Sequence, residues 1–199
     1  LIYYKNTAMA EVLTPNRDHR RIKHQIDAYG VCLRVIARGD LEMVRTWRND
    51  PYIKQFMVSQ ETISASQQLE WFDSISASET QQHFIINYKS EPIGVINIKS
   101  ANSDALATAA QVEVGMYIFD ERYRANFLAF CPALAINDYC FEQLSCDSLL
   151  ASVLPVNKAA IKFNTALGYQ TIESGELISM TLQKENYVNA SKKIKRFIR

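Results

Sequence analysis

One carboxylate stands alone in the apolar stretch Val112-Glu113-Val114-Gly115. The alternation of residue types predicts a strand, and Glu113 lies near the centre of the sheet if this is its fourth strand. Partial burial raises the pKa of a carboxyl group toward the working pH, and a carboxylate in that state suits a general base. The alternative interpretation is structural, with Glu113 paired to a nearby arginine.

A second group of candidate residues surrounds Trp47, near the end of a predicted helix. Arg48 and Asn49 follow it directly, and a guanidinium beside an amide suits an anionic or hydroxylated ligand. Aromatic faces beside polar groups also suit sugar rings, and Trp71 is the second tryptophan of the chain. Burial in the core is the alternative interpretation of both tryptophans.

Composition argues against several other kinds of site. The three histidines have neither metal-ligand spacing nor a neighbouring nucleophile. With 22 basic and 21 acidic residues, the net charge of +1 gives no overall field that favours nucleic acid or an anionic membrane. No Cys-x-x-Cys pair occurs, which indicates free thiols rather than zinc ligands or a disulfide framework. The cysteines are Cys32, Cys131, Cys140 and Cys146.

The sequence contains no recognisable targeting or membrane-spanning segment. No apolar run approaches the ~20 residues that cross a bilayer, and Lys5 interrupts the N-terminus before a signal-peptide core. We therefore expect a soluble, cytoplasmic protein.

The order of predicted elements indicates an α/β protein with a mixed sheet. Asp40 is expected to cap a helix over 41–49, and Ser64 or Ser66 a second one that ends at residue 75. Further helices are expected from the 120–126 segment to residue 141 and over 159–167. The expected strands are 32–37, 83–88, 93–99, 111–119, 148–154, 170–174 and 177–183.

Residues 157–169 contain the sharpest motif, Asn-Lys-Ala-Ala-Ile-Lys-Phe-Asn-Thr-Ala-Leu-Gly-Tyr. A polar residue stops an apolar strand, an amphipathic helix follows, and a glycine ends it. This order resembles the last strand–helix unit of the GNAT acyltransferases, which forms one wall of an acyl-CoA slot in that family. The matching positions are Asn157, Ala160, Ile161, Leu167, Gly168 and Tyr169.

The resemblance implies an α/β (α+β) fold with a mixed, mostly antiparallel central sheet of about seven strands. Helices are expected on both faces, and the parallel strands 111–119 and 148–154 are expected to splay apart around acetyl-CoA. The implied reaction is direct transfer of an acetyl group to a primary amine, without a metal. A small-molecule acceptor is expected, with no nucleic-acid or membrane partner and with a possible homodimer.

Site roles also follow from the resemblance. Glu113 is expected to be the base, and Tyr117 and Asn164 to lie at the leaving thiolate. The residues expected to hold acetyl-CoA are Met116, Tyr117, Ile118, Arg124, Ala125, Asn126, Phe127, Leu128, Ala129, Asn157, Ala160 and Phe163. Those expected at the acceptor are Trp47, Arg48, Asn49, Met57, Gln68 and Trp71.

Four positions depart from the family pattern. Ala125 and Phe127 stand where the phosphate turn usually has glycine, whose missing Cβ lets a phosphate approach the backbone. Asn164 replaces a tyrosine that serves as a proton donor in many members, and Gln68 replaces a histidine. These departures motivate an alternative, a non-catalytic acyl-CoA-binding module that keeps the fold.

The first half of the chain indicates which subset of the GNAT family this sequence resembles. The segments Thr46–Pro51 and Gln68–Phe72, with Met57 and Ile63, resemble the ribosomal-protein N-terminal acetyltransferases and, more closely, the amino-sugar acetyltransferases of pseudaminic-acid-type pathways. A nucleotide-linked amino sugar is therefore the expected acceptor, and a protein N-terminal or side-chain amine is the alternative.

The domain organisation expected from the sequence has three parts. They are an N-terminal arm over 1–30, an acyltransferase domain over 31–185 and a basic C-terminal tail over 186–199. The tail is interpreted either as a solvated helix end or as a segment that docks to an acidic surface.

Overall fold

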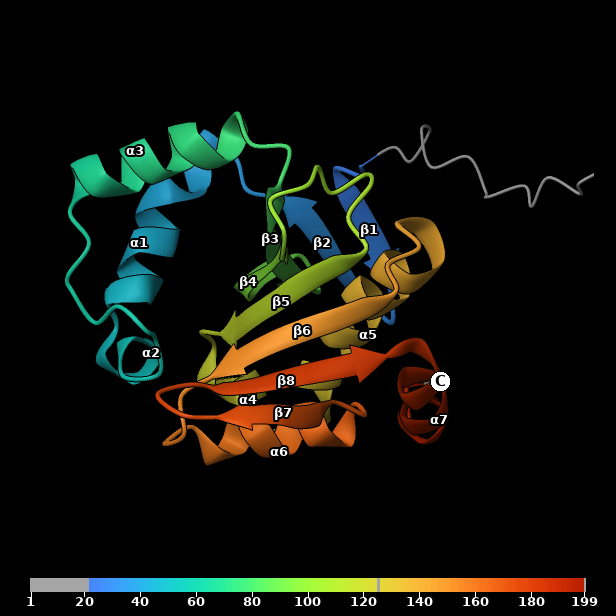
Figure 1. The fold of residues 1–199 in the computed structure, drawn as a ribbon. Coiled ribbons are helices and arrows are strands. Elements are labelled where there is room, and N and C mark those ends of the chain that lie inside the picture. The colour runs from blue at the N-terminus through green and yellow to red at the C-terminus, as the bar shows by residue number, and fades with distance from the viewer. Residues whose placement is uncertain (1–21, 125, 199) are drawn as a thin grey trace, which may run out of the picture.

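The computed structural model describes residues 22–124 and 126–198. Eight strands form one sheet in the order β1-β2-β3-β4-β5-β6-β8-β7 (Figure 1). All neighbouring pairs are antiparallel except β5 and β6, which run parallel. The strands are β1 (Gln25–Ala28), β2 (Val31–Val35), β3 (Gln81–Tyr88), β4 (Glu91–Ser100), β5 (Gln111–Ile118), β6 (Ser148–Val153), β7 (Gln170–Ser174) and β8 (Ile178–Gln183).

Helices cover both faces of this sheet, as the resemblance implied (Figure 1). The helices are α1 (Leu41–Asn49), α2 (Pro51–Lys54), α3 (Ala65–Ser76), α4 (Glu121–Arg124), α5 (Phe130–Asp138), α6 (Lys158–Ala166) and α7 (Lys184–Lys195). Short 3₁₀ turns, η2 (Arg38–Asp40) and η3 (Phe127–Ala129), precede α1 and α5, and a π-helical turn, η4 (Tyr139–Gln143), extends α5.

The main core lies between the sheet and α5. Every residue from Cys131 to Asn137 is buried, which is expected of a helix enclosed on all sides. Leu134 and Ile136 share one hydrophobic cluster with fully buried side chains of the central strands, among them Phe84 and Ile96. This cluster fixes α5 behind the sheet, and it therefore also fixes the turn that leads into α5.

A smaller cluster packs α1 and α3 on the opposite face. Val44 and Trp47 from α1 meet Ile85 and Val95 of the sheet. The Trp47 ring stacks on Phe119, with centroids 5.1 Å apart. Trp47 is therefore a core anchor of the α1 face, as its alternative interpretation held.

Several helix ends follow from local sequence. Ser64 and Gln67 form a reciprocal capping box at the start of α3. Asn157 accepts a hydrogen bond from the Ala160 N–H, 3.0 Å away, at the start of α6. Gly168 then follows α6 with φ of +100°, and a Cβ there would lie 2.8 Å from the Asn186 carbonyl, so the position requires glycine on two grounds.

Asp40 corrects one expectation. It lies at the N-cap position of α1, but its side chain makes no capping bond there. Its carboxylate instead accepts two hydrogen bonds from Arg34, at 2.7 and 2.8 Å, and one from the Ala37 N–H. The arginine holds the pKa of Asp40 below its usual value.

The two ends of the described chain join the sheet and its core. Residues 25–28, expected in an arm, pair with 31–34 as the edge strand β1, which brings the sheet to eight strands. Residues 1–21 of that arm lie outside the described part. Most of the expected tail is helix α7, with Tyr187 and Ile194 buried against the core.

A single carboxylate ties α7 to the rest of the fold. Asp138 accepts hydrogen bonds from the Tyr187 hydroxyl at 2.5 Å and from Lys195 Nζ at 2.9 and 3.0 Å. It also accepts one from the Tyr29 hydroxyl, in the β1–β2 turn. Burial and the neighbouring carboxylate raise the pKa of both tyrosines.

Two further findings concern the described residues only. None of their helices is both long and apolar enough to cross a membrane. Their histidine, cysteine and acidic side chains form no group of three or more that is placed to hold a metal ion.

Candidate functional site

The sheet divides between β5 and β6. Their parallel pairing covers three residue pairs, from Gln111 beside Ser148 to Glu113 beside Leu150. Beyond that point β5 stays paired with β4 up to Ile118, and β6 stays paired with β8 up to Val153. The two strands therefore separate toward their carboxyl ends, as the sequence predicted (Figure 1).

Strand alternation decides which backbone groups face this gap. The Ala110 carbonyl accepts from Asp147 at the start of β6, and the Phe119 N–H donates to Ile93 at the start of β4. Even-numbered residues of β5 thus direct their backbone groups toward β6, and odd-numbered ones toward β4. Met116 lies in the stretch of β5 without a β6 partner, so its N–H and C=O face the gap.

Glu113 marks the point where the strands part. Its side chain is half-buried and lies on the same face of β5 as Tyr117, which packs in the α1–α3 cluster. Among the described residues Glu113 makes no hydrogen bond or ion pair, although Lys99 is its cross-strand neighbour on β4. The arginine pairing that was the structural alternative is absent from the described part of the chain.

The side chains of Tyr117 and Arg48 lie close enough on this face to interact electrostatically. The Tyr117 hydroxyl is buried and has no hydrogen-bond partner among the described residues. Burial raises its pKa, and the nearby Arg48 opposes that effect. Burial likewise lowers the pKa of Arg48. Arg48 donates through Nη2 to the Ser59 carbonyl at 3.0 Å, whereas its Nη1 is buried without a partner.

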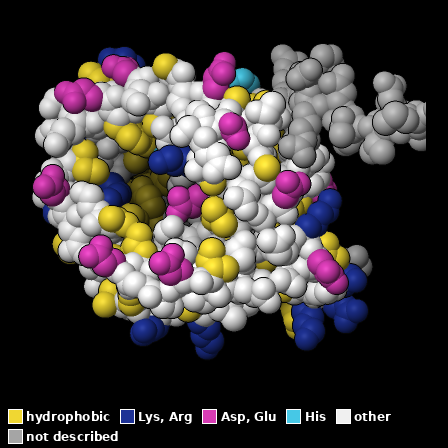
Figure 2. Space-filling model, in the orientation of Figure 1, with side chains coloured by type: hydrophobic (Ala, Val, Ile, Leu, Met, Phe, Trp, Pro, Cys, Tyr) yellow, Lys and Arg dark blue, Asp and Glu magenta, His cyan; other side chains and the backbone are white. Residues whose placement is uncertain are grey.

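A hollow opens between helices α1–α3 and strands β4 and β5 (Figure 2). Hydrophobic side chains form its floor, and basic and acidic groups lie at its rim. Gln68 of α3 is 4% exposed, and its Nε2 is another buried donor without a partner in the described chain. Trp71 follows one turn later and contacts His83 edge-on, with centroids 5.1 Å apart.

A polar row crosses the sheet beneath these helices. His83, Asn97 and Gly115 lie side by side on β3, β4 and β5. A Cβ on Gly115 would lie 2.6 Å from the Asn97 Oδ1, so the glycine leaves room for the Asn97 amide between Glu113 and Tyr117. The sequence analysis missed Asn97, because only the strand register reveals this placement.

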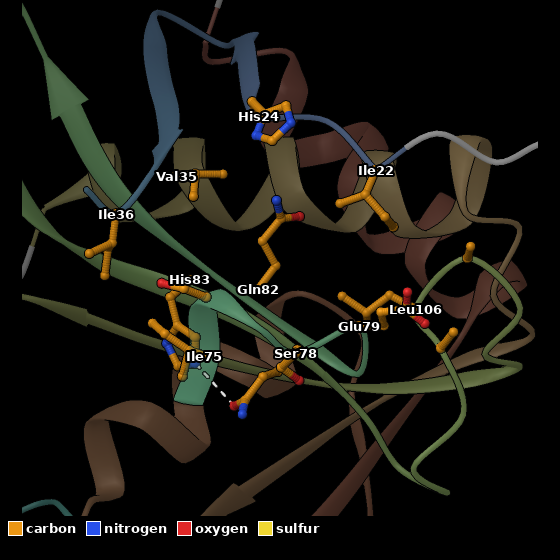
Figure 3. A pocket seen from close by; sticks show the side chains of 14 residues that line it. Ile22, His24, Val35, Ile36, Ile75, Ser78, Glu79, Gln82, His83 and Leu106 are labelled. Carbon is orange, nitrogen blue, oxygen red and sulfur yellow. Dashed lines mark hydrogen bonds between the residues drawn. The ribbon is translucent and has the colours of Figure 1, made fainter. Parts of the chain in front are cut away.

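His83, which the sequence analysis set aside, is a half-buried side chain that is neutral near pH 7. Burial lowers its pKa to about 4, and its Nε2 lies 3.2 Å from the Gln81 Oε1. A cavity of about 410 Å³ lies on its other side, at the end of the sheet away from the β5–β6 gap (Figure 3). His83 therefore contacts Trp71 and also lines this cavity.

Asn49 and Met57 belong to the segment that links α1 to α3. The Asn49 amide is fully engaged, since it donates to the Ile63 carbonyl and accepts from the Ile63 N–H, both at 2.8 Å. Asn49 therefore holds the linking segment in place. Met57 is half-buried in that segment, between α2 and α3.

The phosphate turn, residues 124–129, is largely satisfied by its own chain. The Arg124 guanidinium donates to the Ile118 and Phe119 carbonyls and lies 4.1 Å from the Tyr52 ring centroid. Asn126 accepts a hydrogen bond from the Leu128 N–H at 2.8 Å. An N–H that points outward at a helix start is the usual ligand of a phosphate, and the Leu128 N–H is already bonded to Asn126. Ala125 lies outside the described residues.

A row of phenylalanines borders this turn. Phe130 of α5 stacks on Phe163 of α6, with centroids 4.7 Å apart. Phe127 is 40% exposed and contacts Phe130 and Phe197, at 5.5 and 5.8 Å. Phe127 therefore packs toward the C-terminal segment. The Phe130–Phe163 pair links the two helices that flank the β5–β6 gap.

The remaining expected residues lie along α6 and η3. The Asn157 side chain caps α6, which presents Ala160 and Phe163 to the main cluster. The Asn164 Nδ2 lies 3.9 Å from the Met180 sulfur, so its amide faces β8. Ala129 is buried at the start of α5.

The comparison with protein families gives a match to the acetyltransferase (GNAT) domain over residues 31–170. The chain belongs to the GNAT acetyltransferases. Residues 31–170 make up more than half of the chain and include both strands of the gap. The family expected from residues 157–169 is thereby confirmed, and the protein is an acetyltransferase.

Named relatives are distant. The chain is 26% identical over 125 residues to Acetyltransferase PseH of Campylobacter jejuni. The aligned residues cover 62% of this chain and 72% of PseH. PseH from a second strain of that species is 25% identical over 123 residues.

Solved structures share the fold at low identity. An apo structure of FdhC, described as a nucleotide-linked sugar GNAT, aligns with a TM-score of 0.73 at 22% identity and covers 89% of this chain and 100% of its own. An aminoglycoside acetyltransferase AAC(6')-Ib in complex with coenzyme A aligns with a TM-score of 0.69 at 17% identity, over 80% and 98% of the two chains. A Bacillus halodurans protein aligns with a TM-score of 0.75 at 14% identity, over 85% and 92%.

Proposed function

We propose that this acetyltransferase moves the acetyl group of acetyl-CoA to the primary amine of a nucleotide-linked amino sugar. The likeness to PseH and to the sugar GNAT FdhC supports a small amine acceptor. The hollow on the α1–α3 face supplies the physical argument for the acceptor's chemistry.

The observation that carries the proposal is a set of buried polar atoms without partners. Arg48 Nη1, Gln68 Nε2 and Tyr117 Oη all belong to elements that border the hollow. An unpaired buried donor costs about 1–3 kcal/mol, so an empty arrangement of this kind is expensive. The two nitrogens can only donate, and a guanidinium prefers an anion. A phosphate-bearing sugar satisfies these donors, and the hydrophobic floor suits one face of its ring.

Backbone and side-chain groups next to the gap fit a pantetheine arm. The free N–H and C=O of Met116 allow the amide-bearing arm to pair like an added strand. The phosphate turn fits less completely, because Asn126 already binds the Leu128 N–H. Binding of the pyrophosphate there requires the Asn126 side chain to rotate away.

The chain's own residues then account for the proton transfers. Acetyl-CoA supplies an activated acetyl group as a thioester. Glu113, with no other partner in the described chain, takes the proton that the acceptor amine must lose. The Tyr117 phenol keeps its proton at neutral pH, and burial raises its pKa further, so its hydroxyl is the proposed donor to the leaving sulfur. The Met116 N–H offers a hydrogen bond to the developing charge on the carbonyl oxygen.

The test is a panel assay that follows release of free thiol from acetyl-CoA. We expect turnover with an amino sugar joined to a nucleoside diphosphate, less with the free amino sugar, and little with peptides. Preference for peptide N-termini would contradict the acceptor proposed here. If no acceptor reacts, but acetyl-CoA raises the melting temperature by binding the folded state, the chain is a non-catalytic acyl-CoA-binding module.

A further inference from the structure

Asn97 lies on β4 beside the two residues of β5 that the proposed function uses as base and acid. Its direct partner across the β4–β5 ladder is Gly115, and Glu113 and Tyr117 stand two residues to either side of that glycine. Alternation along each strand puts these side chains on the α1–α3 face. Diagonal neighbours on paired strands are about 7–8 Å apart, so one small group can contact Asn97 together with either of the two.

The amide of Asn97 is free for a ligand. Its nitrogen and oxygen make no hydrogen bond with any described residue. The side chain is half-buried, yet neither amide atom is among the buried polar atoms without a partner. Its neighbour on β3, His83, directs Nε2 to the Gln81 Oε1. A ligand in the hollow can therefore reach both the acceptor oxygen and the donor nitrogen of this amide.

The pairing of Asn97 with Gly115 is unfavourable for the sheet itself. Both residue types are depleted in strands, where β-branched side chains pack better. A glycine within a strand often marks a place where another group approaches closely. Here that group is the Asn97 Oδ1, which a Cβ on residue 115 would meet at 2.6 Å. The glycine thus lets the amide lean over β5, the strand that borders the gap.

A carboxamide at this place suits the amine that attacks the thioester. As the nitrogen lone pair forms the C–N bond, Glu113 takes one N–H proton, and the C–S bond breaks with its electrons going to sulfur. The nitrogen gains positive charge during the attack, so a hydrogen bond from its second N–H to an amide oxygen strengthens in the transition state. An amide oxygen accepts this bond without competing for the proton.

We propose that Asn97 is a further catalytic residue, whose carboxamide oxygen accepts a hydrogen bond from the acceptor amine while Glu113 takes its proton. Gly115 leaves the room that this amide needs. The inference rests on the proposed acetyl transfer to a primary amine. It concerns the reacting nitrogen alone, so it applies equally to an amino sugar and to a peptide amine.

Steady-state kinetics with acetyl-CoA and a nucleoside-diphosphate-linked amino sugar test the proposal. Asn97→Ala is expected to lower kcat about tenfold, through loss of one charge-assisted hydrogen bond, and to leave the acceptor KM and the melting temperature at parent values. The pH profile of kcat should keep its shape, because Asn97 acts on the amine rather than on Glu113. Asn87→Ala is the matched control, since Asn87 is half-buried on β3 of the same sheet.

Gly115→Ala tests the same contact with Asn97 still present. The added methyl group must displace the Asn97 amide, so kcat is expected to fall by a similar factor. In an Asn97→Ala background, Gly115→Ala should have no further effect, because no amide is left to displace. A further fall in the double variant would show that the glycine serves the ligand directly, and it would overturn the role given to the pair.

The remaining outcomes separate this inference from the proposed function. Parent-like kcat in Asn97→Ala overturns the role of Asn97 while acetyl transfer stands. A shifted pH profile also overturns it, because Asn97 then acts on the Glu113 carboxylate, and a fall in melting temperature alongside kcat assigns Asn97 a structural role. If the parent acetylates only a peptide amine, the amino-sugar acceptor is wrong, and Asn97→Ala is expected to lower kcat with that peptide. A parent that acetylates no amine contradicts both proposals.

Discussion

The proposed acceptor half and the proposed cofactor half of the site differ in how their polar groups are bonded. On the α1–α3 face, Arg48 Nη1, Gln68 Nε2 and Tyr117 Oη are buried without partners in the described chain. In the phosphate turn, Arg124 and Asn126 are bonded to the chain's own backbone. Under the proposed function, the acceptor side is therefore preorganised for a ligand, whereas the cofactor side is expected to exchange internal hydrogen bonds for ligand ones.

This difference has an energetic consequence. Preorganised but unsatisfied groups lower the stability of the free protein and favour binding, because the ligand removes their desolvation cost. Self-satisfied groups do the reverse, since their bonds must break first. The glycine-poor sequence of the turn agrees with this view, because Ala125 and Phe127 stand at positions where the family pattern has glycine.

Glu113→Gln is expected to produce the largest effect. Loss of the base should lower turnover about a hundredfold, the usual scale of general base catalysis, while coenzyme A affinity stays at the parent value. Steady-state kinetics and calorimetry measure the two quantities. Glu173→Gln, exposed on β7, is the control. Parent-like turnover in Glu113→Gln would assign Glu113 a purely structural role.

Arg48→Gln is expected to rank second. Removal of one charged hydrogen bond to the acceptor should raise the acceptor KM about thirtyfold and leave the KM for acetyl-CoA unchanged. Arg38→Gln is a suitable control, because Arg38 is exposed in the turn before α1. If the KM for acetyl-CoA rises instead, the assignment of the two halves is reversed.

Tyr117→Phe should separate activity from stability. Turnover is expected to fall about tenfold, below the usual range for acid catalysis because a thiolate leaves readily. The melting temperature should stay level or rise, since the change deletes a buried hydroxyl that has no partner in the described chain. A clear fall in melting temperature would show that the hydroxyl is satisfied in solution.

Asn126→Ala is expected to have the smallest effect. Unlike the changes above, it should strengthen the binding of a ligand, coenzyme A. Loss of the cap should lower the free energy of unfolding by about 1 kcal/mol. It should also tighten coenzyme A up to about fivefold, because the Leu128 N–H no longer has an internal partner. Ser64→Ala, at the cap of α3, should lose similar stability without this gain. Weaker coenzyme A binding in Asn126→Ala would make the Asn126 side chain a ligand.

Local sequence was sufficient for the elements whose ends are set by neighbouring residues. The Ser64 box, the Asn157 cap and the Gly168 end were predictable because each depends on contacts within a few residues. The Asp40 cap was not, because its carboxylate finds a stronger partner in Arg34 on β2. Strand β1 was missed for a similar reason, since its four residues gain their pairing only from β2.

The placement of the candidate site residues was predictable only in part, and their roles stay predictions. That Glu113 and Tyr117 lie on one face of one strand follows from alternation. The placement of Asn97 over Gly115 requires the register of β4 against β5. That Asn49 is occupied by Ile63, and that Arg48 has a free Nη1, depends on how the segment between α2 and α3 folds back, which no local pattern encodes.

The shortness of the β5–β6 ladder also bears on which acyl groups the protein tolerates. Because only three residue pairs join the two antiparallel blocks, a change in the angle between them breaks no antiparallel ladder. Under the proposed function, side-chain contacts such as Phe130 on Phe163 are then expected to set the width of the slot. A single aromatic substitution between α5 and α6 is therefore expected to change which acyl groups bind, without disturbing the sheet.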